Sequence, residues 1–116
     1  MKRILFNLNG HDNIAAAIGN HCQVSIGDYA RRRFPDGETY LRVDSPVRGA
    51  DVVLLCGLEQ PDDKFLPLLF LSRQLKQMGA RSVGLVTPYL AYMRQDRRFM
   101  DGEALTSRHF AELLSN

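Results

Sequence analysis

The hydrophobic positions of this chain fall into short runs separated by polar turns. Residues 4–8 form a first apolar run, which predicts a strand that ends at Asn9-Gly10. Asp12 or Asn13 can cap a helix that continues through Ile18, and residues 23–26 predict a short second strand. The start of the chain therefore predicts a strand, a helix and a second strand.

A hairpin is predicted next, because two strand-like runs at 29–34 and 39–43 flank Pro35-Asp36-Gly37. Proline presets one backbone dihedral of a turn, and glycine supplies the positive φ that a tight reversal needs. The two strands of a hairpin are antiparallel, so this segment is expected to form a flap beside the rest of the sheet.

Continuous apolar runs at 51–56 and 82–86 predict strands that are covered on both faces. The segment between them has leucines at helical spacing, with a cap near Asp63 and a C-terminal glycine at Gly79. Pro67 is expected in the first turn of that helix. A long polar loop then leads to a last helix capped by Thr106 or Ser107. Alternating strands and helices predict an α/β fold, with a mostly parallel sheet flanked by helices and an antiparallel hairpin flap.

Composition and charge limit the classes of partner and cellular location that we expect for this protein. A chain of 116 residues is large enough for one domain with its own core, and its net charge of +2 gives no reason to expect nucleic acid as a partner. The apolar run at the start is too short for a signal peptide, and no stretch is long enough to span a membrane, so we expect a cytoplasmic protein. Cys22 and Cys56 have no metal-ligand spacing and are expected to be small buried thiols.

The hairpin turn carries the first group of candidate binding residues. Phe34 offers a ring face for stacking, and Asp36 and Glu38 offer carboxylates that can accept hydrogen bonds from an exocyclic amine. The alternative is a solvated hairpin with a buried Phe34, because Pro-Asp-Gly is common turn chemistry.

The loop after the strand at 82–86 carries the second group. Ligands of open α/β sheets bind at the carboxyl ends of strands, where Thr87-Pro88-Tyr89 begins and Arg94, Gln95, Asp96 and Arg97 follow. Arginine is suited to phosphate because its planar fork presents paired donors. The alternative is a solvated, self-paired run of charges. The two common glycine-rich phosphate loops are absent from the sequence.

At these residues the chain resembles ribose-phosphate pyrophosphokinase, also called phosphoribosyl pyrophosphate synthetase. The resemblance rests on Phe34-Pro35-Asp36-Gly37-Glu38, on Val47-Arg48-Gly49-Ala50-Asp51-Val52, and on Pro88-Tyr89-x-x-Tyr92-x-Arg94-Gln95-Asp96-Arg97. Gly102-Glu103-Ala104-x-Thr106-Ser107 completes it. The order and spacing of these segments agree from Asn7 to Leu114.

The resemblance implies a function that the residues alone do not. Family members transfer a pyrophosphoryl group from ATP to the anomeric hydroxyl of ribose 5-phosphate, need Mg²⁺, and build their sites across the subunits of an oligomer. Phe34, Asp36 and Glu38 match the family flap, which contacts adenine in a neighbouring subunit. Arg94, Gln95 and Asp96 match the element that helps to hold ATP, and Arg97 extends it.

The family is built from two similar α/β domains, and residues 1–116 match the first, a phosphoribosyltransferase-like half that contacts ATP. The family's metal-assisting histidine, catalytic loop and ribose-phosphate loop follow later in its pattern, so we expect no catalytic residue within this chain and no activity from the chain alone. The alternative is a non-catalytic binding or regulatory module that assembles with a full-length enzyme.

Overall fold

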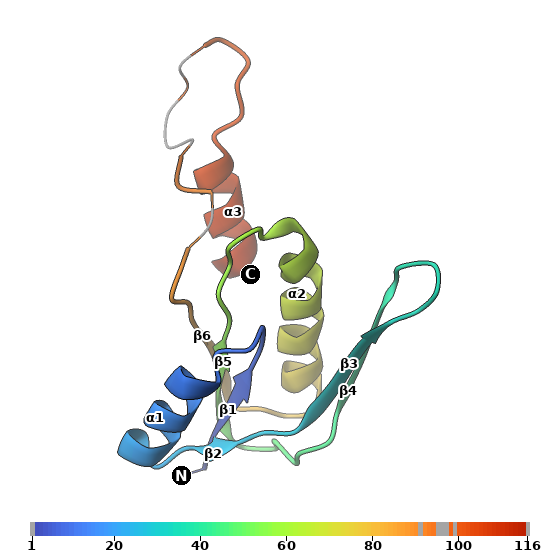
Figure 1. Cartoon of the computed structure of the whole chain (residues 1–116), viewed down its shortest axis with the longest axis vertical. Coiled ribbons are helices and arrows are strands. Elements are labelled where there is room, and N and C mark those ends of the chain that lie inside the picture. Colours follow the sequence, from blue (N-terminus) through green and yellow to red (C-terminus); the bar gives the residue numbers. More distant parts are fainter. Residues whose placement is uncertain (1, 91, 95–97, 99, 116) are drawn as a thin grey trace.

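The structure is a computed structural model that describes residues 2–90, 92–94, 98 and 100–115. Its elements follow one another in the predicted order (Figure 1). They are β1 (Arg3–Asn7), α1 (Asp12–Cys22), β2 (Ser25–Ile26), β3 (Tyr29–Arg33), β4 (Thr39–Val43), β5 (Asp51–Leu55), α2 (Asp62–Gln77), β6 (Ser82–Val86) and α3 (Thr106–Ser115).

The main sheet is parallel and has the strand order β2-β1-β5-β6. Ile4 of β1 lies opposite Val52 of β5, which in turn lies opposite Val83 of β6. The crossover through α1 leads outward from β1 to one edge, and the crossover through α2 leads from β5 to the other. The carboxyl ends of β1 and β5 therefore form a topological switch point, which is where open α/β sheets bind ligands.

The two helices cover opposite faces of this sheet because side chains alternate along each strand. Phe6 of β1 and Leu54 of β5 pack with Leu71 of α2 in the larger core cluster. Leu5 and Leu55 are the sequence neighbours of Phe6 and Leu54, so their side chains lie on the opposite face of the sheet, where they pack against α1. This arrangement confirms the prediction of a mostly parallel sheet flanked by helices, with a buried strand at β5. The prediction of a strand covered on both faces is wrong for β6, which lies at the edge of the sheet and has no buried residue; Val86 is 44% exposed.

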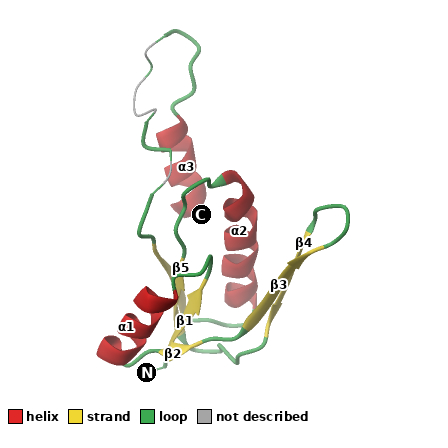
Figure 2. Cartoon of the chain, viewed as in Figure 1, coloured by secondary structure: helices red, strands yellow, loops and turns green. Residues whose placement is uncertain are grey.

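Strands β3 and β4 form a separate two-stranded antiparallel ribbon, as the hairpin pattern predicts (Figure 2). Its base joins the core, because the ring of Tyr29 meets the ring of Phe6 edge to face with centroids 6.0 Å apart. The tip, residues 34–38, stands clear of the body of the molecule. The ribbon is thus anchored at one end and exposed at the other.

The helix starts differ from the predicted caps. Neither α1 nor α2 has a side-chain cap, and the residues before them are His11 and Pro61. The Asp12 carboxylate accepts a hydrogen bond from the side-chain amide of Asn7 at 2.9 Å. It is therefore directed back to β1 rather than to the backbone amides of the helix. Pro67 lies in the second turn of α2 and not in the first, because the helix begins at Asp62. Gly79 has the expected positive φ of 96° after the helix.

The two cysteines are in different environments, so the prediction of two buried thiols is wrong for one of them. Cys22 is exposed at the end of α1, whereas Cys56 is buried just after β5. Burial raises the pKa of the Cys56 thiol. In the described part of the chain, no helix has the length and apolar character needed to cross a membrane.

Candidate functional site

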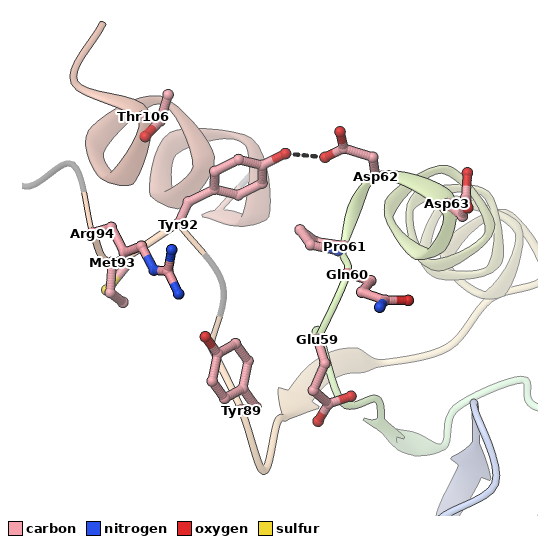
Figure 3. Close-up of a pocket in the computed structure, with 10 residues that line it drawn as sticks. All are labelled: Glu59, Gln60, Pro61, Asp62, Asp63, Tyr89, Tyr92, Met93, Arg94 and Thr106. Atoms are coloured by element: carbon pink, nitrogen blue, oxygen red, sulfur yellow. Dashed lines mark hydrogen bonds between the residues drawn. The ribbon is translucent and has the colours of Figure 1, made fainter.

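A cavity of about 640 Å³ lies where the amino end of α2 meets the loop that follows β6 (Figure 3). Its size is within the range of small-molecule sites. Residues from the β5–α2 connection, the β6–α3 loop and α3 line it: Glu59, Gln60, Pro61, Asp62, Asp63, Tyr89, Tyr92, Met93, Arg94 and Thr106. The cavity is therefore at the carboxyl ends of β5 and β6, as the sequence predicts for a ligand site.

The loop forms one wall of the cavity with an arginine and two tyrosines. The guanidinium of Arg94 points across the cavity toward Gln60 and Pro61 on the opposite wall (Figure 3). Tyr89 is 52% exposed and presents its ring to the same space. An exposed aromatic face beside a guanidinium is suited to a ligand that has both a flat ring and an anionic group.

The opposite wall carries three carboxylates, and each has a partner. Lys64 donates to Glu59 at 3.2 Å, Tyr92 donates to Asp62, and Arg33 lies 3.9 Å from Asp63. The hydrogen bond from Lys64 is the main reason that the pKa of Glu59 is lowered.

Among the described residues, no group of three or more His, Cys, Asp or Glu side chains is arranged to hold a metal ion. In the part of the chain that the structure describes, these carboxylates therefore do not form a preformed metal site.

The hairpin tip is preorganised by its own hydrogen bonds. The Glu38 amide donates to the Asp36 carboxylate at 3.0 Å, and the Gly37 and Phe34 amides close the turn at 2.8 Å each. The bond from the Glu38 amide is the main cause that lowers the pKa of Asp36. Phe34 is 44% exposed and meets the ring of Tyr40 edge to face, with centroids 5.8 Å apart. Phe34 is thus a supported, accessible ring, and the alternative of a buried Phe34 is wrong.

The structure does not bring the two groups of predicted binding residues together within one chain. Arg94 lines the cavity, but none of the residues 34–38 is among those that line it. Gln95, Asp96 and Arg97 lie outside the described residues. The tip of the chain therefore does not line the cavity of the same chain in this structure.

Tyr92 and Asp62 have a part in this site that was not predicted from the sequence. The Tyr92 ring packs against Phe110, with centroids 4.9 Å apart. The hydroxyl reaches Asp62, thirty positions earlier in the chain, and that bond raises the pKa of Tyr92. The pair has no spacing signal, because it is created only when the loop folds over the end of α2.

Comparison with protein families gives one match over almost the whole chain. Residues 3–116 match the family model described as the N-terminal domain of ribose phosphate pyrophosphokinase. The ribose-phosphate pyrophosphokinase of Saccharolobus solfataricus is 46% identical over 83 residues, which are 71% of this chain and 28% of that protein. The one from Methanobrevibacter smithii is 36% identical over 90% of this chain and 35% of that protein. The chain thus spans about a third of the length of these relatives.

Solved structures agree with the sequence comparison. Phosphoribosylpyrophosphate synthetase from Mycobacterium smegmatis superposes with a TM-score of 0.89 and 27% identity, over 99% of this chain and 39% of that one. A purine phosphoribosyltransferase from Pyrococcus horikoshii superposes with a TM-score of 0.55 and 10% identity over 78% of this chain and 64% of that one. The second match shows the shared fold alone.

Proposed function

The chain belongs to the family of N-terminal domains of ribose-phosphate pyrophosphokinases, and on that basis we propose that it is the ATP-contacting part of such an enzyme. The complete enzyme transfers the pyrophosphoryl group of ATP to the anomeric hydroxyl of ribose 5-phosphate. The observation that carries the proposal is the guanidinium of Arg94, which points into a cavity at the carboxyl edge of the sheet. In our proposal Arg94 binds phosphate oxygens of ATP, with Gln95, Asp96 and Arg97 following it in the same segment.

The charges around the cavity are compatible with a polyanion. Glu59 and Asp62 accept hydrogen bonds from Lys64 and Tyr92, and Arg33 lies 3.9 Å from Asp63. The amino end of α2 adds a favourable dipole for negative charge. Phosphoryl transfer depends mainly on positioning and on neutralising charge on the transferred group. Arg94 can supply both positioning and charge neutralisation, because its planar guanidinium fixes the orientation of a bound phosphate and carries a positive charge.

The hairpin tip supplies base recognition in this proposal. Phe34 stacks on adenine, and the carboxylates of Asp36 and Glu38 accept hydrogen bonds from its exocyclic amine. Asp36 is an ionised acceptor at neutral pH, as a carboxyl with an ordinary or lowered pKa is. One Asp36 oxygen already accepts the Glu38 amide, which leaves the other to face the base.

Mg²⁺ enters this proposal with the nucleotide. Mg²⁺ keeps several waters and is commonly held through phosphates with one or two carboxylates. The described residues contain no ready group of metal ligands, so no step is assigned to a metal held by this chain. When bound to the triphosphate, the ion supplies charge neutralisation.

The proposed enzyme is a homo-oligomer in which the tip of one chain meets the cavity of another. What supports this proposal is that the tip stands clear of the body of its own chain and does not line that chain's cavity. A mixture of Phe34→Ala chains and Arg94→Ala chains, unfolded and refolded together, then contains sites with an intact tip and an intact cavity. Activity above that of either variant alone is expected. No recovery in mixed oligomers would refute the shared site.

The activity is tested on the product of the complete reading frame, with formation of phosphoribosyl pyrophosphate from ATP and ribose 5-phosphate as the readout. Arg94→Ala is expected to raise the KM for ATP by roughly tenfold to a hundredfold, because a hydrogen bond to a charged group is worth about 1.5–3 kcal/mol. Arg108→Ala is the matched control, since Arg108 pairs with Glu112 on α3 and does not line the cavity.

Three outcomes separate the possibilities. Product formation with an ATP KM that depends on Arg94 supports the proposal. Product formation with an unchanged KM in Arg94→Ala removes Arg94 from the site. A full-length protein that makes no phosphoribosyl pyrophosphate, yet co-purifies with a catalytically active relative, supports the alternative that the protein is a regulatory module.

A further inference from the structure

Tyr92 stands in an unusual backbone conformation two residues before Arg94. Its φ is 64°, in the left-handed region that residues other than glycine rarely adopt. Such a conformation persists when surrounding contacts hold it. The contacts here are specific and come from two helices, so the position of this part of the loop is determined by tertiary structure.

The first contact ties the loop to α2. The Tyr92 hydroxyl donates to the carboxylate of Asp62, the first residue of that helix (Figure 3). Asp62 itself is favourably placed, because a carboxylate in the first turn interacts with the positive end of the helix dipole. The bond therefore joins the two walls of the cavity across its rim.

The second contact ties the loop to α3. The Tyr92 ring packs on Phe110, which is itself buried and packs on Phe65 of α2 at a centroid distance of 5.5 Å. The ring is held by apolar packing, whereas the hydroxyl makes the polar bond. The two contributions can be separated experimentally, because Tyr92→Phe removes the hydroxyl and keeps the ring.

We propose that Tyr92 and Asp62 are positioning residues, which fix the loop so that the Arg94 guanidinium is aimed into the cavity before the nucleotide arrives. The inference rests on the proposed function, since it concerns the same site. Neither residue needs to touch the nucleotide in this arrangement. Preorganisation of a binding group lowers the ordering cost that binding would otherwise incur.

The negative charge of Asp62 and its role as a hydrogen-bond acceptor for Tyr92 can be tested separately. Asp62→Asn keeps an oxygen that can accept the tyrosine hydroxyl but removes a negative charge from the wall of an anion site. This variant is expected to bind ATP within about twofold of the unmodified protein, or more tightly. Asp62→Ala removes the same charge and also the acceptor, so it is expected to bind ATP less tightly than Asp62→Asn does.

The experiment measures the KM for ATP and the ATP dissociation constant by calorimetry on the product of the complete reading frame. Tyr92→Phe is expected to weaken both by about threefold to tenfold, the equivalent of one ordinary hydrogen bond. Tyr29→Phe is the matched control, because it also loses one hydroxyl bond, to the Asn7 carbonyl, but Tyr29 does not line the cavity. Its ATP affinity is expected to be unchanged.

A double-mutant cycle tests whether Tyr92 acts through Arg94. Adding Tyr92→Phe to Arg94→Ala is expected to change the ATP affinity by less than about twofold, because coupled residues are not additive. An equal loss in both backgrounds, or no loss from Tyr92→Phe in the unmodified protein, would overturn the inference. If Arg94→Ala itself binds ATP normally, the proposed role of Arg94 fails first, and the positioning role fails with it.

Discussion

Gly27 is the position at which the chain leaves the parallel sheet and turns toward the hairpin. Its amide donates to the Leu5 carbonyl at 2.7 Å, which holds it against β1. A Cβ atom at this position would lie 2.5 Å from Cζ of Phe6 and 2.9 Å from Cγ2 of Ile4. Both side chains are almost completely buried, with 0% and 2% of their surface exposed. Gly27→Ala therefore places a methyl group inside the core.

The expected cost follows from the size of this overlap. Neither neighbour can move into solvent, and Phe6 is also held by the ring of Tyr29. Inserting a methyl into a well-packed core costs about 1–3 kcal/mol. With a urea m-value of about 1–3 kcal/mol per molar, the unfolding midpoint is expected to fall by roughly 1 M. Because Tyr29 begins β3, the displaced ring also disturbs the base of the hairpin.

The assay is urea unfolding followed by far-UV circular dichroism, with Gly84→Ala as the matched control. Gly84 lies in β6, and a Cβ there meets no heavy atom within 4 Å. Alanine at that position is expected to be neutral or to stabilise by about 0.4–1 kcal/mol, because it restricts the unfolded chain. Equal midpoints for the two variants would show that the core accommodates the methyl group, and would refute the reasoning from the contact distances.

Two further predictions concern the hairpin tip and the thiols. Tyr40→Ala removes the ring that packs against Phe34. Because an aromatic pair contributes about 0.5–1.5 kcal/mol, the KM for ATP is expected to rise by about twofold to tenfold. An unchanged KM would mean that Phe34 does not depend on Tyr40 for its position. At pH 8 a chromogenic disulfide reagent is expected to modify Cys22 quickly and Cys56 only after denaturant is added, because burial shields the Cys56 thiol from the reagent and raises its pKa. Two equal rates in the native protein would contradict the burial of Cys56.

Much of the fold could be predicted because its strands carry clear signals. The run at 51–56 is apolar on both faces, and the structure buries it between two helices. The turn at Pro35-Asp36-Gly37 predicts the hairpin, and the glycine has the required φ of 93°. These signals are local, so a single sequence is enough to detect them.

The helix starts were harder to predict because their polar side chains had competing partners. Asp12 has the chemistry of a cap, but the nearby Asn7 amide provides another donor for its carboxylate. Asp63, the predicted cap of α2, is instead the second residue of that helix and lies 3.9 Å from Arg33. Sequence identifies a residue that can accept a hydrogen bond, but the folded chain determines which donor is within reach.

The same limitation explains why the electrostatics of the candidate site could not be predicted from composition. Glu59, Asp62 and Asp63 are close together in sequence, and three carboxylates near a phosphate site suggest repulsion. Their partners come from three separate segments of the fold, which are α2 for Lys64, the β6–α3 loop for Tyr92 and the hairpin for Arg33. The guanidinium of Arg94 is the cation of the opposite wall that faces the cavity in the described part of the chain. An anion entering the cavity would thus meet a cation that is not paired with these carboxylates, so the acidic wall is compatible with the proposed triphosphate site.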